Sequence, residues 1–220
     1  KEYRSEYISQ RFTPIAILLV VLILVLIFVP RLVRRLAPVQ RLSQTRVMRE
    51  MRYGSYAMFH PFDGYWDIKR EKRGSIASAA IFFVLFALIY MIRAQYSGYL
   101  FSSKPSDQVN VWFELARMMI PILLWCVSNW CFTTLMEGEG SLKDIFIATG
   151  FALKPYIYLS IPLFIMSHVL TSEEAVFYTV LNTISIIWVV ALLFFGMMMT
   201  HDYSLGKALL TLLLTLVYGP

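Results

Sequence analysis

A block rich in positive charge, with a long uncharged apolar run on either side, occupies the first third of the sequence. Eleven Lys and Arg residues but only four Asp and Glu residues lie between Pro30 and Ile76. Positive charge next to a membrane span stays on the cytoplasmic side. The block therefore predicts an integral membrane protein in which residues 31–75 are cytoplasmic or interfacial and the adjoining runs cross the bilayer.

The composition argues against a soluble protein. Hydrophobic residues make up 58% of the chain and charged residues 15%, a balance that is unusual for soluble globular domains. The net charge of +6 belongs almost entirely to the basic block, and each basic residue beside anionic lipid gains roughly 1 kcal/mol. We therefore expect the block to bind anionic lipids of the bilayer and no nucleic acid, with a helix over residues 31–56 lying on the inner leaflet.

Apolar runs predict an all-α integral membrane protein with six transmembrane helices. An anchor helix over residues 14–30 precedes the basic segment, and a five-span domain covers residues 76–220. The five later spans are expected at about residues 76–92, 111–132, 145–168, 175–199 and from 205 onward. Each run is about as long as a hydrocarbon core of about 30 Å requires.

The first apolar run has the features of a stop-transfer anchor. Arg31, Arg34 and Arg35 follow it, and it lacks the small-residue cleavage site of a signal peptide. Residues 1–13 are then the extracellular tail of a missing upstream module. The predicted topology places the N-terminus outside and alternates from there.

Two polar clusters share the predicted cytoplasmic side with the basic block. Glu137 and Glu139 lie among glycines between the third and fourth spans, and His201 and Asp202 lie between the fifth and sixth. Carboxylates with a histidine can ligate a metal or act as an acid–base pair, but they also cap helices and dock partners. We expect capping, packing or docking, no metal and no cofactor, with Glu139 or Asp202 bonded to backbone N–H groups or to a basic side chain.

Sequence signatures of catalysis do not accompany these clusters. The chain has no HExxH, nucleophile elbow, P-loop or Gly-rich dinucleotide fingerprint. Ser141 and Asp144, in contrast, have the spacing of a capping box at the start of the fourth span. The residues around the clusters thus fit helix ends better than an active site.

An aromatic segment, Phe59–Trp66, interrupts the basic block. Its proline and glycine argue against a continuous helix, and aromatic rings with polar edges suit the headgroup region. The sequence predicts an interfacial loop here. Four of its residues either dock a partner on the cytoplasmic face or hold the loop among headgroups: His60, Pro61, Tyr65 and Trp66.

Three polar residues fall inside predicted spans, where they are costly. Asn129 is expected to hydrogen-bond a neighbouring helix. Lys154, if it faces inward, needs Glu137, Glu139 or a backbone carbonyl as its partner. Together with Asn182, these residues are sparse for the lining of a permeation path.

Five ordered segments resemble the Ypt-interacting-protein (Yip) family. They are Phe59–Trp66, Leu124–Trp130, Thr134–Ser141, Leu153–Tyr156 and Gly196–Ser204. The resemblance covers about residues 57–220 and does not include the anchor helix. It implies a five-span helical domain whose own N-terminal end, after the anchor helix, is cytoplasmic. It also implies a role in membrane organisation and not in catalysis.

The resemblance is to a bacterial member, which implies a bacterial plasma membrane. Eukaryotic Yip proteins bind prenylated small GTPases in vesicle traffic, whereas bacterial ones are commonly encoded beside sugar-import ABC transporters. It thus implies a non-enzymatic accessory or scaffolding subunit that contacts membrane transporter subunits, with an extracellular glycan-capturing module upstream. Two alternatives stay open: a metal-dependent membrane enzyme that uses the cytoplasmic-face carboxylates and histidine, and a channel or carrier that uses the intramembrane polar residues.

Overall fold

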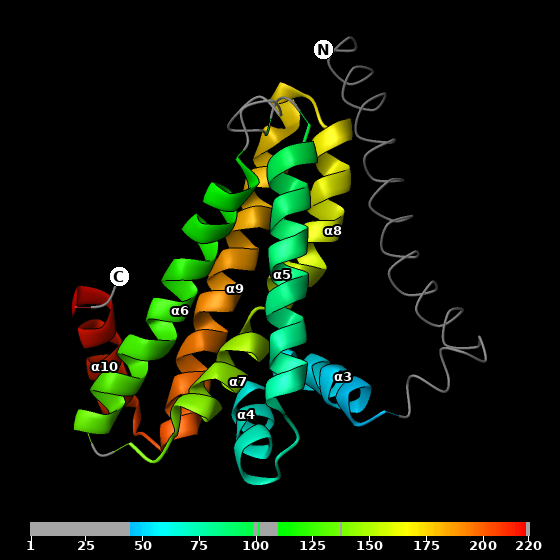
Figure 1. Cartoon of the computed structure of the whole chain (residues 1–220). Helices are drawn as coiled ribbons and strands as arrows, with labels where there is room; N and C mark the ends of the chain where they lie inside the picture. The colour runs from blue at the N-terminus through cyan, green and yellow to red at the C-terminus, as the bar shows by residue number, and fades with distance from the viewer. Residues whose placement is uncertain (1–44, 99–100, 102–109, 137, 219–220) are drawn as a thin grey trace, which may run out of the picture. The chain divides into compact units, whose positions relative to one another are not determined.

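The computed structural model describes residues 45–98, 101, 110–136 and 138–218. The chain divides into two units, Lys1–Met48 and Arg49–Pro220. Its elements (Figure 1) are helices: α3 (Arg46–Phe59), α4 (Pro61–Arg70), α5 (Ile76–Tyr96), α6 (Val111–Leu135), α7 (Leu142–Ala152), α8 (Lys154–Val169), the 3₁₀ helix η2 (Ser172–Glu174), α9 (Ala175–His201) and α10 (Leu205–Tyr218). The predicted tail over 1–13, the anchor over 14–30, the start of the basic segment and Glu137 lie outside the described residues.

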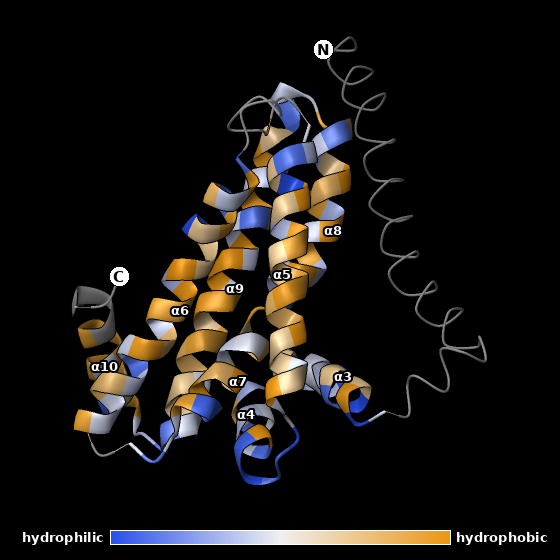
Figure 2. Ribbon diagram, in the orientation of Figure 1, coloured by the Kyte–Doolittle hydropathy of each residue, from blue (hydrophilic) through white to orange (hydrophobic). Residues whose placement is uncertain are grey.

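Four helical stretches are long and apolar enough to cross a membrane, and they confirm four of the six predicted spans. They are Ile76–Tyr96, Val111–Leu135, Leu142–Val169 and Ser172–His201. Figure 2 shows apolar residues along α5 and α9 and hydrophilic residues toward both ends of the bundle. The sixth predicted span begins where α10 begins, but α10 has 14 residues and is shorter than the other four. The sixth span therefore stays a prediction.

The third of these stretches lies inside the bundle. Within it, 67% of the most apolar window is buried, against 11–28% in the other three, so α5, α6 and α9 turn their outer faces to the surroundings. α7 packs against α5, α6 and α9, and α8 packs against α5 and α9. The predicted fourth span is thus two helices, which separate at Leu153 because Pro155, in the first turn of α8, has no N–H to continue the hydrogen bonding of α7.

The aromatic segment Phe59–Trp66 is helical, so the predicted loop is wrong. The chain breaks only at His60, and Pro61 opens α4 at a position where its missing N–H costs nothing. Gly64 brings α4 close to α3, because a Cβ there would lie 2.4 Å from the Cα of Ala57. The proline and glycine that predicted a loop instead start a helix and allow a close contact.

Capping boxes begin two of the helical stretches, and the first of them is the one that the sequence predicted. Ser141 and Asp144 form a capping box, in which the Ser141 N–H donates to Asp144 Oδ2 at 3.0 Å and the Asp144 N–H donates to Ser141 Oγ at 3.3 Å. At the other end of the bundle, Thr171 and Glu174 form a second capping box before α9. These caps satisfy N–H groups that a helix start leaves unpaired.

Candidate functional site at the basic end of the bundle

Four segments that are distant in sequence converge at one end of the bundle, which we call the basic end: α3, α4, residues 138–141 and residues 202–204. Figure 1 shows α3 and α4 at the lower end, beside α7 and the foot of α5. The sequence-predicted residues of the cytoplasmic face all belong to this end, apart from Glu137, which lies outside the described residues. Their geometry decides which of them can act together.

Two cations from α4 and two carboxylates from the inter-span turns form one ion-pair network. Lys69 Nζ lies 3.4 Å from Glu139 Oε2 and 3.5 Å from Asp202 Oδ2. Arg70 Nη2 lies 3.2 Å from Glu139 Oε2 and also pairs directly with Asp202. Both cations occupy the last turn of α4, where the helix dipole favours positive charge. The expectation that Glu139 or Asp202 bonds a basic side chain is confirmed for both.

Asp202 is held ionised by this network. Partial burial raises the pKa of its carboxyl group, but the charge of Lys69 and the hydrogen bond and charge of Arg70 outweigh that effect and lower the pKa below its ordinary value. Asp202 also has left-handed backbone angles, with φ 54° and ψ 41°, at the end of α9. It therefore combines a helix-ending conformation, which Asp and Asn tolerate, with a charge that binds α4.

We expect Asp202→Asn to reduce stability by about 1 kcal/mol or less at pH 7, because the pairs are partly exposed. A lowered carboxyl pKa stabilises the folded state above the unfolded-state pKa, and this contribution is lost as the pH falls through the folded-state value. The difference from wild type should thus narrow below about pH 3.9. Thermal unfolding in detergent across pH 7 to 3 measures it, and a difference independent of pH would contradict the charge-based account.

His201 supports the glycine-rich bend and does not face solvent. Its side chain is 2% exposed, and its Nδ1 accepts a hydrogen bond from the Gly140 N–H at 3.2 Å. The ring stacks on Tyr203, whose hydroxyl donates to the Thr133 carbonyl at 3.1 Å. A Cβ at Gly138 would lie 2.6 Å from His201 Nδ1, so the bend fits closely over the ring. The geometry therefore assigns His201 a role in packing, which is one of the alternatives that the sequence left open.

The same geometry does not assemble the metal-binding set considered from the sequence. Among the residues that the structure describes, no three His, Cys, Asp or Glu side chains come together as potential metal ligands. Glu139 and Asp202 direct their carboxylates at Lys69 and Arg70, while His201 directs Nδ1 at a backbone amide. These side chains connect chain segments to one another.

α3 is attached to the bundle by polar side chains. Lys154, buried at the start of α8, donates to the Met51 carbonyl at 2.5 Å and to Ser55 Oγ at 2.8 Å. The Ser75 hydroxyl, at the cap of α5, bonds to the buried carboxylate of Glu50. The sequence offered a backbone carbonyl as one partner for an inward-facing Lys154, and that alternative is confirmed.

Asn129 and Asn182 differ from each other in their surroundings. Asn129 is 1% exposed, and within the described part of the chain neither of its side-chain polar atoms has a hydrogen-bond partner. The predicted hydrogen bond from Asn129 to a neighbouring helix is therefore wrong among the described residues, and the side chains around it on α7 and α9 are mainly apolar. Asn182 instead accepts a hydrogen bond from Arg93 at 3.0 Å, near the opposite end. The three intramembrane polar residues do not form one path.

The aromatic residues of α3 and α4 divide into a buried and an exposed set. Tyr65 is 1% exposed and belongs to the core. Phe59 and Phe62 pack edge-on or tilted against α9 rings but stay 63% and 49% exposed, and Trp66 is 45% exposed. His60 stacks on Tyr56 with ring centroids 4.6 Å apart. Among the predicted docking residues, His60 and Trp66 therefore remain exposed, and a partner can reach the larger ring of Trp66.

Sequence reasoning missed Lys69 and Arg70 as parts of this site and Arg93 as a half-buried residue with hydrogen-bond partners on other helices. The sequence placed the first two only within the basic block over residues 31–75, although their position in the last turn of an amphipathic stretch was a usable signal. The partners of Arg70, Glu139 and Asp202, lie 69 and 132 residues further along the chain. A local sequence pattern cannot indicate which charged residues form ion pairs across such a separation.

The bundle has four apolar helical stretches long enough to cross a membrane, and ion pairs and hydrogen bonds hold its basic end together. These are the features of a multi-pass membrane protein. A family model described as the Yip1 domain matches residues 56–219, which is most of the chain. The protein therefore belongs to the Yip1 domain family, and the resemblance noted in the sequence is confirmed. No curated protein and no solved structure matches the chain.

Proposed function

We propose that this protein is a non-enzymatic accessory or scaffolding subunit of the plasma membrane. Its basic end faces the cytoplasm and serves as a docking platform for a membrane partner, for which the family resemblance suggests the membrane subunits of a carbohydrate ABC importer. The excess of Lys and Arg over residues 31–75 supports this orientation. Anionic headgroups would then surround the platform and attract it to the inner leaflet.

The observation that carries the proposal is the combination of a fixed platform with exposed rings. α4 is held to the segments after α6 and α9 by the Lys69 and Arg70 ion pairs, and to α9 and α7 by packing. Trp66 lies on this same short helix and remains half-exposed. An exposed aromatic ring on a helix that is already fixed in place is a typical interface anchor, because binding costs little conformational freedom.

Trp66→Ala tests this proposal against a matched control at the other end of the bundle. Trp112, near the start of α6, is 79% exposed and offers the same residue type far from the platform. We expect Trp66→Ala to weaken co-purification of the importer subunits in mild detergent by about thirtyfold, as a hot-spot loss of about 2 kcal/mol implies. Trp112→Ala should leave co-purification unchanged.

The two variants also separate docking from lipid anchoring. If Trp66 only holds α4 among headgroups, Trp66→Ala lowers thermal stability in detergent while the complex survives. An unchanged complex with the Trp66→Ala variant would therefore contradict the docking proposal. A complex lost equally in both variants would point to non-specific adhesion through exposed rings, and that result also counts against docking at the basic end.

A further inference from the structure

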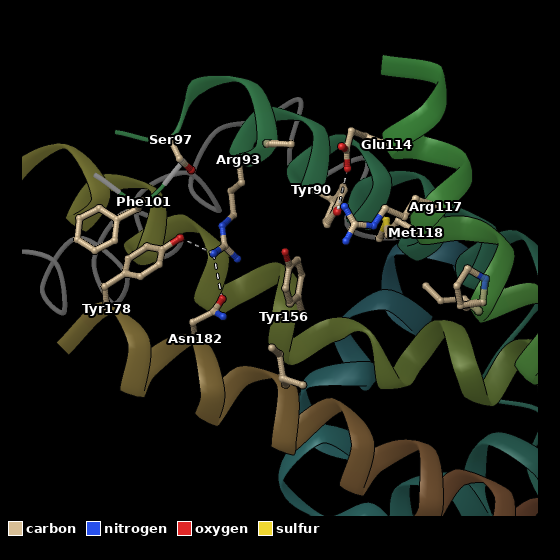
Figure 3. Close-up of a pocket in the computed structure, with 14 residues that line it drawn as sticks. Tyr90, Arg93, Ser97, Phe101, Glu114, Arg117, Met118, Tyr156, Tyr178 and Asn182 are labelled. Carbon is tan, nitrogen blue, oxygen red and sulfur yellow. Dashed lines mark hydrogen bonds between the residues drawn. The ribbon is translucent and has the colours of Figure 1, made fainter. Parts of the chain in front are cut away.

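A cavity of about 690 Å³ lies in the half of the bundle opposite the basic end (Figure 3). It arises from the division of the third membrane stretch. α7 fills the space between α5, α6 and α9 in the lower half, but after Leu153 the chain continues as α8, which packs on α5 and α9. Beyond the end of α7 the space between α5, α6 and α9 is therefore left open, and the cavity occupies it.

Three helices turn one face each toward this space. The lining positions on α5, α6 and α9 recur at intervals of three or four residues, so they share a face on each helix. Tyr156 of α8 also lines it. The lining side chains with charged or polar tips are Tyr90, Arg93, Ser97, Glu114, Arg117, Tyr156, Tyr178 and Asn182. Figure 3 shows them around one opening, with Arg93 reaching toward α9 from one side and Arg117 on the other.

Arg93 is held in place by neutral groups. Its guanidinium donates to Ser160 Oγ at 3.1 Å, to the Tyr178 hydroxyl at 2.8 Å and to Asn182 Oδ1 at 3.0 Å. The ring of Tyr156 lies 5.3 Å from its carbon Cζ. Its Nε is buried, and the residues described here supply no hydrogen-bond partner for it. These contacts fix the guanidinium without adding a formal negative charge.

Among the lining residues that the structure describes, positive charge exceeds negative charge. Arg93 and Arg117 are the cations of this set, and Glu114, which accepts a hydrogen bond from the Tyr90 hydroxyl at 3.5 Å, is its carboxylate. One negative charge against two positive ones leaves room for an anion. Guanidinium groups bind phosphate more strongly than neutral donors do, because the hydrogen bonds are charge-assisted.

The lower part of the cavity is apolar. Met118, Pro121 and Ile122 of α6 and Ile186 of α9 line it without any polar atom at their tips. α6 and α9 are also two of the helices that expose large apolar residues to their surroundings. A hydrocarbon chain is the occupant that fits such a lining, whereas a free hydrophilic anion would leave it uncovered.

We propose that this cavity binds one phospholipid with an anionic headgroup. The phosphate lies between Arg93 and Arg117, the tyrosine hydroxyls and Asn182 contact its oxygens or the headgroup, and one acyl chain follows the apolar side chains of α6 and α9. The site is separate from the basic end and does not depend on the partner proposed above. It would fasten α6, which lacks α7 beside it at this height, to the rest of the bundle.

Native mass spectrometry of the full chain, purified in mild detergent, tests the proposal. Phosphatidylglycerol and phosphatidylcholine with identical acyl chains are added separately, and inorganic phosphate is the third probe. We expect one tightly retained phosphatidylglycerol per protein, weaker retention of phosphatidylcholine and no effect of inorganic phosphate on thermal stability. Equal retention of both lipids would overturn the anionic selectivity, and stabilisation by inorganic phosphate equal to that by lipid would overturn the lipid assignment.

Three variants locate the bound lipid. Arg117→Gln removes a cation whose side chain is exposed at the cavity mouth, and Ile186→Trp fills the apolar part. We expect retention to fall about tenfold in Arg117→Gln, as the loss of one charge-assisted contact implies, and further in Ile186→Trp. Arg52→Gln, which removes an exposed cation at the basic end, is the matched control and should retain the lipid. Wild-type retention in both cavity variants, or loss only in Arg52→Gln, would overturn the proposal.

Discussion

Tyr65→Ala is expected to destabilise the protein by about 3–5 kcal/mol, the usual range for removing a large buried ring. The side chain is 1% exposed and lies in the core cluster shared by α4, α5, α7 and α9. Gly196 of α9 leaves just enough room for it, since a Cβ there would lie 3.2 Å from Tyr65 Cε1. Alanine would leave a cavity at the point where α4 packs on the spans. Thermal unfolding in detergent, followed by tryptophan fluorescence, measures the loss.

Two neighbouring variants make this prediction specific. Tyr65→Phe keeps the ring and removes a hydroxyl that is buried without a hydrogen-bond partner in the described structure, so it should match or exceed wild-type stability. Trp66→Ala, at an exposed position, should lower stability far less than Tyr65→Ala. A Tyr65→Phe variant as unstable as Tyr65→Ala would show that the hydroxyl, and not the ring, carries the effect.

The contrast between Tyr65 and Trp66 also corrects the sequence-based site. The sequence placed both residues on one cytoplasmic face, for docking or a structural role, but adjacent residues of a helix point about 100° apart. The sequence did not reveal this difference because the segment was interpreted as a loop, in which the two rings could turn the same way. Once α4 is a helix, one ring is in the core and the other faces outward.

Membrane spans were the most predictable part of the fold. A run of about 20 apolar residues has few alternatives to a membrane helix, because its backbone must satisfy its own hydrogen bonds in lipid. The division of the fourth span at Leu153 was less visible, since Pro155 alone is tolerated within many membrane helices. The ends of the spans followed local rules, as the Ser141–Asp144 box shows.

For the site, the sequence predicted which charged segments are present but not which of their residues contact each other. The acidic turns and the basic foot of α5 were each recognised, but which cation meets which carboxylate depends on how the helices cross. Lys69 reaches Glu139 and Asp202 only because α4 folds back beneath α7 and α9. Asn129 illustrates the opposite error, because a polar residue in a span was assumed to have a partner that the packing does not supply.

Gly64→Ala is expected to separate α4 from α3 and to cost about 1–3 kcal/mol, the typical penalty for an added buried methyl group. Its Cβ would lie 2.4 Å from the Cα of Ala57 and 2.6 Å from its Cβ. A backbone atom cannot move aside by changing rotamer, so one helix must shift. The ion pairs made by Lys69 and Arg70 at the end of the same helix would shift with it.

Gly206→Ala in α10 is the matched control, because a Cβ there would meet nothing within 4 Å. Alanine favours helix over glycine by up to about 1 kcal/mol, so Gly206→Ala should keep or raise the unfolding temperature while Gly64→Ala lowers it. Adding Ala57→Gly to Gly64→Ala removes the contact between the two Cβ atoms but leaves the shorter contact with the Ala57 backbone. The double variant should therefore recover only part of the lost stability. Full recovery would mean that α3 and α4 are kept together by side-chain fit alone and that their backbones can separate without loss.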